Sequence, residues 1–315
     1  MSWFVSPRRL RDLGILGMNA RNGLYIGQYN PRKLYPLVDD KLQTKRLAQE
    51  AGLSVPALYG VVRTHHDIRR VSKILDTHRS FVVKPSRGAG GEGIVVIDDR
   101  LDENLFRRAS GRTMTLEQLE HHVSNILSGA YSLGGLPDVA MIEQRVEFSD
   151  LFKDISYQGV PDIRIIVYRG YPAMAMIRLP TQQSDGKANL HQGAIGAGID
   201  LKTGCTTRGV WDNQPVDNHP DTGHTIIGHQ IPEWVRLLEL AAGCFDLTGL
   251  GYLGVDIVLD QRYGPLILEL NARPGLAIQI ANRQGLKHNL EQIDRCVQTN
   301  PDADIVTRSR WYEAH

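Results

Sequence analysis

Cysteine, net charge and long apolar runs are all scarce in this sequence of 315 residues. Its three cysteines (Cys205, Cys244 and Cys296) are far apart and lack C-x-x-C spacing, which argues against a disulfide framework or a cysteine zinc site and predicts a cytoplasmic protein. Lys and Arg number 36 against 35 for Asp and Glu, so the net charge of +1 predicts no nucleic-acid partner. No apolar run is long enough to predict a signal peptide or a transmembrane segment.

The N-terminal sequence MSWFVSPRRLRDLG combines an aromatic pair with several arginines. The simpler interpretation is a segment that docks on the body of the protein. The alternative is a segment that lies on a membrane surface or on a partner.

Capping residues, turn residues and β-branched runs divide the chain into predicted elements. Residues 1–38 are predicted to be rich in loops. The predicted helices cover 39–52, 64–78, 115–129 and 231–249, and the predicted strands cover 80–84, 93–98, 138–148, 252–260 and 264–275, with a hairpin over 162–179 that turns at Gly170 and Pro172. Strands gather in clusters with helices between them rather than in regular βαβ alternation, which predicts the α+β class.

The glycine-rich sequence VVKPSRGAGGEGIVVI, residues 82–97, fits the G-x-G-x-x-G pattern. A dinucleotide-binding turn would open a helix, but the residues after Gly93 form a β-branched run. No G-K-[ST] follows the glycines, Lys84 precedes them, and no H-R-D or D-F-G triplet occurs downstream, which excludes a Walker A loop and a protein kinase. What remains is a β-hairpin whose backbone N–H groups and Lys84 bind phosphate, or else an exposed hairpin with a surface lysine.

Oxygen-bearing side chains recur on two later strands. Period two places Ile267, Glu269 and Asn271 on one strand face, and Asp256 lies on the preceding strand. Acids among apolar residues are rare unless they are paired or bind a metal, so this set predicts a magnesium site. Asp260 is interpreted as an ordinary residue of a solvated sheet face.

Seven ordered motifs between Asp39 and Gly285 resemble the ATP-grasp superfamily, and within it the glutamate-ligase-like relatives of the enzyme that modifies ribosomal protein S6. The motifs are DDKLQTK, VVKPSRGAGGEGI, MIEQRV, PDIRIIV, NLHQGA, GVDIV and LELNARPG. The resemblance implies two α+β lobes gripping ATP: a short N-terminal extension (1–38), a small subdomain bearing the lid (39–138) and a large subdomain with the Mg²⁺ site (139–315).

The resemblance also implies roles for individual residues, named in this chain's numbering. The nucleotide-binding residues are Lys41, Lys84, the lid glycines Gly88, Gly90, Gly91 and Gly93, the hinge residues Glu143, Gln144, Arg145, Val146 and Glu147, and Asp162 and Arg164. Arg178, Arg273 and Asn189 match catalytic positions near the transferred phosphate, and Asp256, Glu269 and Asn271 match the metal ligands.

These matches predict an ADP-forming carboxylate–amine ligase that uses ATP with one or two Mg²⁺ ions, for which Mn²⁺ can substitute. Its substrates would be small-molecule or peptide carboxylates and amines, with glutamate as one candidate. Two alternatives stay open: a small-molecule kinase on the same fold and a non-catalytic nucleotide-binding module. The sequence leaves the oligomeric state open, a homo-oligomer included. It departs from the relatives by its short N-terminal region, by Lys187 in place of arginine and by Ala194 in place of glycine.

Overall fold

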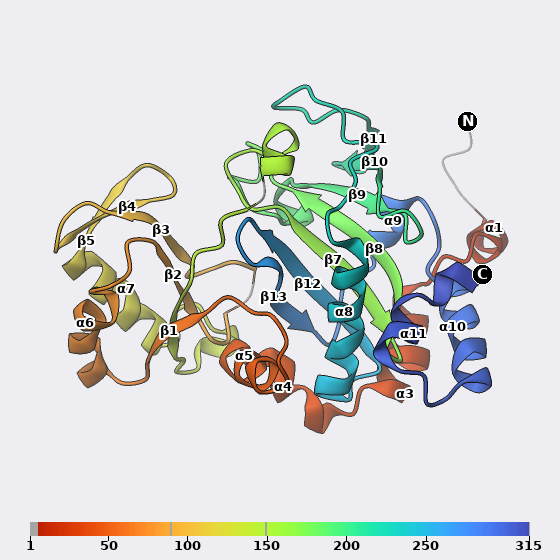
Figure 1. The fold of residues 1–315 in the computed structure, drawn as a ribbon, viewed down its shortest axis with the longest axis horizontal. Coiled ribbons are helices and arrows are strands. Elements are labelled where there is room, and N and C mark those ends of the chain that lie inside the picture. The colour runs from red at the N-terminus through yellow and green to blue at the C-terminus, as the bar shows by residue number, and fades with distance from the viewer. Residues whose placement is uncertain (1–5, 89, 149, 315) are drawn as a thin grey trace. The chain divides into compact units, whose positions relative to one another are not determined.

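The computed structural model describes residues 6–88, 90–148 and 150–314 (Figure 1). The chain divides into a larger unit, Met1–Asp39, Leu47–Ser54 and Glu147–His315, and a smaller unit, Asp40–Arg46 and Val55–Val146. Each unit contains one sheet with antiparallel strand pairs and packed helices, which confirms the α+β class. No helix in the described part of the chain is both long and apolar enough to cross a membrane. The division into an N-terminal extension (1–38), a small subdomain (39–138) and a large subdomain (139–315) stays a prediction.

The smaller unit is built on a six-stranded sheet in the order β1-β6-β2-β3-β4-β5. Its strands are β1 (Leu58–Val62), β2 (Phe81–Pro85), β3 (Val95–Arg100), β4 (Leu105–Arg108), β5 (Thr113–Thr115) and β6 (Ala140–Glu143), and its helices are η3 (His65–Arg70), α6 (Val71–Leu75), α7 (Leu116–Leu127) and η4 (Leu133–Gly135). Phe81, Val83 and Ile142 belong to the core that this sheet shares with α6 and α7. The segment predicted as one helix over 64–78 begins as 3-10 helix η3 and continues as α6, after the predicted Thr64–Asp67 capping box.

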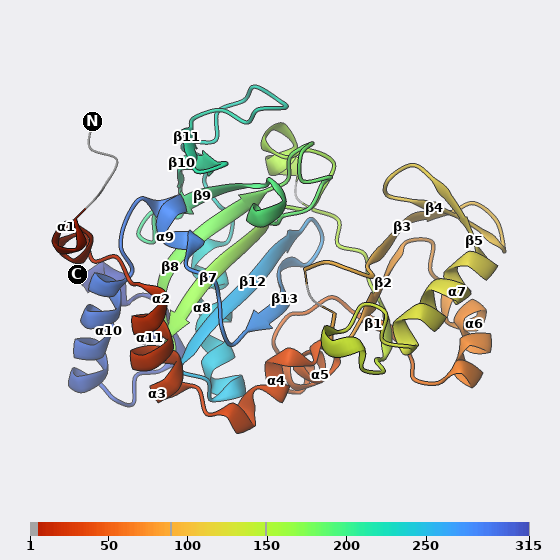
Figure 2. The same ribbon diagram turned by 180° about the vertical axis from the view of Figure 1, so that it is seen from behind.

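The larger unit contains a seven-stranded sheet in the order β11-β10-β9-β8-β7-β12-β13. Its strands are β7 (Asp162–Tyr168), β8 (Tyr171–Leu179), β9 (Ile195–Ile199), β10 (Thr206–Trp211), β11 (Gln214–Val216), β12 (Tyr252–Asp260) and β13 (Gly264–Asn271). Helix α8 (Trp234–Thr248) crosses one side of the sheet, α9 (Ala277–Asn282) contacts β8, β9 and β10, and α10 (Lys287–Thr299) contacts β8 and stands beside the sheet when the molecule is seen from behind (Figure 2). The other elements that follow residue 40 are α5 (Lys41–Glu50), η5 (Asp150–Ile155), η6 (Leu190–Gln192), α11 (Ile305–Ser309) and η7 (Trp311–Ala314).

The N-terminal region is helical, so the predicted loop-rich character of residues 1–38 is wrong for its described part. It forms α1 (Pro7–Asp12), α2 (Met18–Ala20), η1 (Arg21–Ile26), α3 (Gly27–Tyr29), η2 (Arg32–Leu34) and α4 (Pro36–Asp39). Ser6 caps α1, and Pro7 occupies its first turn, where a missing N–H costs nothing. Tyr25 and Ile26 are buried, so tertiary packing stabilises this helix. The sequence did not predict it because turn residues flank it.

Two strand boundaries differ from the prediction. The β7–β8 hairpin turns at Arg169 and Gly170, both with positive φ, whereas Pro172 lies inside β8 opposite Val167, beside a register shift. Strand β6 ends at Glu143 rather than at residue 148, because the N–H of Gln144 donates to Ala57, which lies outside β1.

Candidate active site

One face of the larger sheet gathers six of the side chains that the sequence singled out. In the strand register, Asp162 lies opposite Arg178, Arg164 opposite Asp256, and Asp256 opposite Glu269. Directly opposed residues of antiparallel strands point to the same face. Asn271 follows Glu269 by two residues and joins them, because side chains alternate along a strand.

A β-bulge in β13 decides which side chains share this face. Asp256 pairs with Glu269, but the next residue, Ile257, pairs with Ile267, so Leu268 is an extra residue in β13. Ile267 therefore points to the opposite face, where it is 2% exposed. The prediction that Ile267 shares a face with Glu269 and Asn271 is wrong for this reason, whereas Glu269 and Asn271 do lie on the face of Asp256.

Four of these residues form a buried ion network. Arg164 donates from Nε to Asp256 Oδ1 (2.7 Å) and from Nη2 to Asp256 Oδ2 (2.6 Å). Arg178 donates to both carboxylate oxygens of Asp162 and, over 2.8 Å, to Asp256 Oδ2. Each acid is thus neutralised by a planar guanidinium that matches its geometry.

The two acids of this network differ in pKa. Burial raises the pKa of Asp162 to about 6, opposed by Arg178 and reinforced by the nearby charge of Asp256. Burial acts on Asp256 in the same direction, but two arginines outweigh it and lower the pKa of Asp256 to about 2. Asp256 therefore stays ionised at neutral pH, as an electrostatic ligand for a cation must.

The predicted metal ligands fit a magnesium ion in their chemistry. Asp256 and Glu269 are opposed on neighbouring strands, and a carboxylate that accepts hydrogen bonds from arginine keeps further lone pairs for a cation. Among the described residues, no group of three His, Cys, Asp or Glu side chains is placed to hold a metal. The predicted magnesium site differs from such a group, because its ligands are two carboxylates and the amide of Asn271.

The remaining predicted catalytic residues lie in loops of the same unit. Asn271 accepts a hydrogen bond from the Arg273 N–H (2.9 Å), which fixes the turn after β13. The Arg273 guanidinium is exposed, stacks 5.2 Å from the centroid of the Tyr35 ring and lies 3.9 Å from Asp39 Oδ2. Asn189 caps η6 through a bond from the His191 N–H (3.0 Å). All three side chains therefore have local structural partners.

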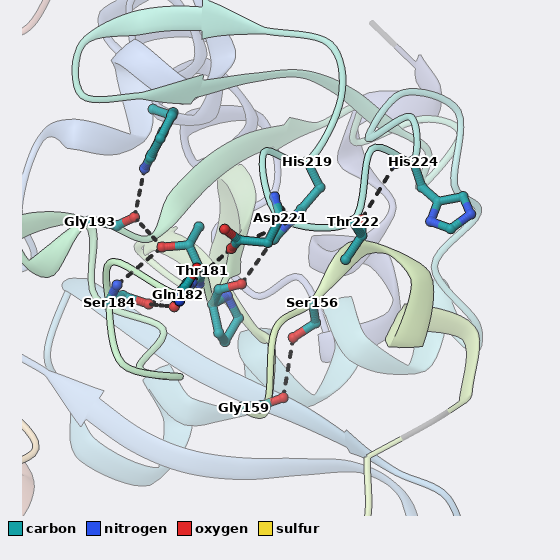
Figure 3. Close-up of polar contacts among 12 residues, drawn as sticks. Ser156, Gly159, Thr181, Gln182, Ser184, Gly193, His219, Asp221, Thr222 and His224 are labelled. Atoms are coloured by element: carbon teal, nitrogen blue, oxygen red, sulfur yellow. Dashed lines mark hydrogen bonds and ion pairs between the residues drawn. The ribbon is translucent and has the colours of Figure 1, made fainter.

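The loop between β8 and β9, which carries Asn189, is fastened by polar contacts, of which those of His219 and Thr181 are buried (Figure 3). His219 bonds through Nε2 to the Pro180 carbonyl (2.9 Å), so Nε2 carries the proton, and Nδ1 accepts the Asp221 N–H. The carboxylate of Asp221 accepts the Gln182 N–H (2.7 Å). Thr181 Oγ1 donates to the Gly193 carbonyl (2.8 Å) and so closes the loop on itself. The loop is thus held rigidly where it leaves Arg178.

The smaller unit contains a second buried charge cluster, centred on Glu143. The Glu143 carboxylate forms ion pairs with the ammonium groups of Lys84 and, over 2.8 Å, Lys45. The three side chains are 3–6% exposed. Burial raises the pKa of Glu143, but the two ammonium groups outweigh it and hold that pKa below its usual range, whereas burial lowers the pKa of Lys45. The cluster carries one negative and two positive charges, so it has an excess of positive charge for an anion.

The glycine-rich segment joins β2 and β3, which are antiparallel, so the predicted strand–loop–strand unit is confirmed. Asp40 caps α5, and Lys41 in its first turn donates to the Gly88 carbonyl (2.7 Å). A side chain at Gly88 would meet Pro85 at 2.3 Å, and one at Gly93 would meet Tyr131 at 2.6 Å. Gly90 and Gly91 have positive φ with open space around them. Ala89, inside the predicted lid, lies outside the described residues.

The predicted hinge residues follow β6. Gln144 exchanges hydrogen bonds with Ala57 through its N–H (2.8 Å) and its Oε1 (3.1 Å). Arg145 pairs with Asp98 (2.8 Å), and Val146 is half-buried. The Gln144 N–H is thus already engaged within the smaller unit.

Glu147 begins the next segment of the larger unit, and its side chain is exposed. Its N–H donates to Asp260 Oδ2 (3.0 Å). Asp260 Oδ1 accepts two further N–H groups, from Arg262 and Tyr263. Asp260 is 4% exposed, so its interpretation as a residue of a solvated face is wrong: it is a buried acceptor that ties the β12–β13 turn to Glu147.

Sequence reasoning assigned no role to Lys45, His219 or Asp221. Lys45 had a usable signal, because it follows Lys41 by one helical turn and so lies on the same helix face. His219 and Asp221 had none, since their partners are backbone groups nearly forty residues away.

The antiparallel fold and the motif-bearing strands are those of the ATP-grasp superfamily. The chain belongs to the sugar-transfer associated ATP-grasp family, whose model matches residues 20–295. None of the curated proteins matches the sequence. The match supports the superfamily, and the finer similarity to the ribosomal protein S6 modification enzymes stays a prediction.

Several solved structures are similar to this chain at low sequence identity. The ATP-grasp ligase PsnB complexed with a minimal precursor is 14% identical, covering 83% of this chain and 60% of PsnB at a TM-score of 0.41. D-alanine–D-alanine ligase from Bacillus anthracis complexed with ATP is 12% identical, covering 82% and 66% at a TM-score of 0.47. The L-amino acid ligase from Bacillus licheniformis is 15% identical, covering 88% and 47% at a TM-score of 0.45. The chain thus spans less than two thirds of each, and these similarities carry no argument about the reaction.

Proposed function

We propose that this protein is an ATP-dependent carboxylate–amine ligase that forms ADP. One observation carries the proposal: a single sheet face holds two opposed acids, Asp256 and Glu269, beside Arg164 and Arg178. Transfer of a phosphoryl group needs charge neutralisation and positioning rather than a protein nucleophile.

In this proposal each cluster has a distinct task. Lys84 and Lys41 of the smaller unit bind phosphate oxygens of ATP, and the glycine-rich segment covers them with backbone N–H groups. Asp256, Glu269 and Asn271 hold magnesium, which when bound neutralises the phosphates. Arg178 and Arg273 stabilise charge that develops on the transferred group, and Asn189 orients it. The substrate carboxylate becomes an acyl phosphate, the amine attacks its carbonyl carbon, and phosphate leaves as the amide forms.

The substrate class follows from the family rather than from the site geometry. Membership of a sugar-transfer associated family supports an acid or an amine carried on a sugar. Uronic acids and amino sugars are therefore candidate substrates, together with glutamate, other amino acids and short peptides.

The test is an ADP-release screen of purified protein with Mg·ATP and pairs of these acids and amines, followed by mass spectrometry. Release of ADP together with an amide product supports the ligase. A phosphorylated product without an amide would identify a small-molecule kinase, and ATP binding without turnover would identify a nucleotide-binding module.

Glu269→Gln keeps the side-chain volume and removes one ligand charge, so we expect ADP release to fall at least 100-fold with little change in unfolding. Glu313→Gln, an exposed acid of the same unit, is the matched control and should keep full activity. Normal turnover by the Glu269 variant would refute the assigned metal site.

A further inference from the structure

The N-terminal segment, residues 7–24, exposes apolar side chains next to arginines. Leu10, Leu13, Met18 and Leu24 are 40%, 52%, 65% and 61% exposed. Helix α1 buries none of its residues. Large apolar side chains clustered at a surface mark sites of interaction. Helix α1 itself is thus exposed, whereas Gly14, at the end of the N-terminal sequence, is buried and its carbonyl accepts the Lys287 N–H, so the segment docks on the body only at its end.

The charge of this region differs from that of the rest of the chain. Residues 6–35 contain six basic side chains and one acidic side chain, Asp12, which gives +5. Since the whole chain carries +1, the remainder carries −4. Within the described part of the chain, Arg8, Arg9 and Arg11 are exposed and form no ion pair. Three guanidinium groups are thus available for an anionic partner.

The segment is fixed at its base and so presents these side chains from a defined position. Gln279 is 4% exposed and bonds to Leu16 in both directions, accepting the N–H (2.8 Å) and donating to the carbonyl (3.0 Å). Lys287 N–H also donates to the Gly14 carbonyl (3.0 Å). The exposure of α1 is therefore not that of a loose chain end.

We propose that residues 7–13 dock on an anionic phospholipid bilayer, with the arginines at the head groups and Leu10 and Leu13 inserted among them. Helix α1 has six residues, about 9 Å of helix, which is too short to bury the roughly 800 Å² per partner of a stable protein interface. A bilayer needs only shallow insertion of a few apolar side chains beside basic ones. Trp3 and Phe4 precede the helix in sequence and are of the type enriched at membrane interfaces.

The test is sedimentation of the whole protein with vesicles of neutral phosphatidylcholine, with and without about 30% phosphatidylglycerol. We expect binding to the anionic vesicles only, and its loss in high salt, where the Debye length is about 3 Å at 1 M. Replacing Arg8, Arg9 and Arg11 by Ser should weaken binding on the order of 100-fold, because each basic residue contributes roughly fivefold. Leu10→Ser with Leu13→Ser should weaken it about tenfold.

Matched controls change the same residue types elsewhere. Arg63, Arg69 and Arg112 are exposed arginines of the smaller unit, and their replacement by Ser makes the same charge change. Leu101 and Leu136 are 45% and 62% exposed and serve for the leucine pair. Equal losses in control and test variants would overturn the proposal, as would absence of binding to anionic vesicles. Self-association in solution that depends on the three arginines, without vesicle binding, would identify a second copy as the partner and would equally overturn it.

Discussion

Glu143→Gln tests the buried cluster of the smaller unit most directly. Among the described residues, Glu143 is the only carboxylate that forms an ion pair within 4 Å of the ammonium groups of Lys84 and Lys45. The substitution keeps the volume and leaves two buried positive charges without a counter-charge. Breaking a buried ion pair in this way costs about 3–5 kcal/mol. With a slope of about 2 kcal/mol per molar, the urea midpoint of the smaller unit should fall by roughly 2 M.

The two units can be followed separately in one experiment. Trp211, Trp234 and Trp311 are the tryptophans among the described residues, and all three belong to the larger unit, so their fluorescence reports its unfolding. Hydrogen exchange of the β2 and β6 amides reports the smaller unit. We expect a large loss of protection in these strands and an unchanged tryptophan midpoint.

A control variant, Glu103→Gln, and the addition of Mg·ATP complete this test. Glu103→Gln changes an exposed acid of the same unit and should shift stability by less than about 0.5 kcal/mol. Mg·ATP should restore part of the lost protection, since its phosphates supply the missing negative charge. If Glu143→Gln were as stable as the control, the assignment of a charged, tightly coupled cluster would be wrong.

Three further predictions concern the proposed nucleotide site and the ion network. Lys84→Ala should weaken ATP binding at least tenfold by calorimetry, about 1.4 kcal/mol, and unchanged binding would leave Lys84 a structural residue. Residues 90–93 should exchange amide hydrogens quickly in the free protein and slowly with Mg·ATP, whereas protection by NADH alone would contradict the ATP site. Because the pKa of Asp162 is raised to about 6, its contribution to folding is present below about pH 4 and is lost as pH rises through 6. Asp162→Asn should therefore flatten the fall in the unfolding free energy of the larger unit between about pH 4 and 6, followed by tryptophan fluorescence in urea; an unchanged slope would refute the raised pKa.

Local signals in the sequence predicted the elements that local chemistry controls. Helix α7 begins after a capping box at Thr115 and Gln118, and Gly249 ends α8 with a positive φ, so these two ends agree with the helices predicted over 115–129 and 231–249. Period two likewise placed Glu269 and Asn271 on one face. These features depend on neighbours within a few residues.

Features that depend on distant partners escaped sequence reasoning. The bulge at Leu268 breaks the period of β13, and only the register with β12 reveals it. Asp260 looks like a surface acid in sequence, yet its partner Glu147 lies 113 residues away. The predicted metal ligands Asp256, Glu269 and Asn271 share one sheet face, as the motifs suggested, whereas the roles of all predicted site residues still rest on the family resemblance.

The extra residue in β13 has a consequence for insertions and deletions in this strand. Because Leu268 is an extra residue, the alternation of side chains before it is shifted by one residue relative to the alternation after it. The side chains on both sides of Leu268 still point to the same face as the β12 residues opposite them. Deleting Leu268 restores simple alternation and leaves Glu269 opposite Asp256, so the strand should tolerate it. Deleting Leu270 instead, after the bulge, would place Glu269 opposite Val255 and turn it away from the face of Asp256. Among homologous chains, a one-residue gap in this strand should therefore fall before Glu269.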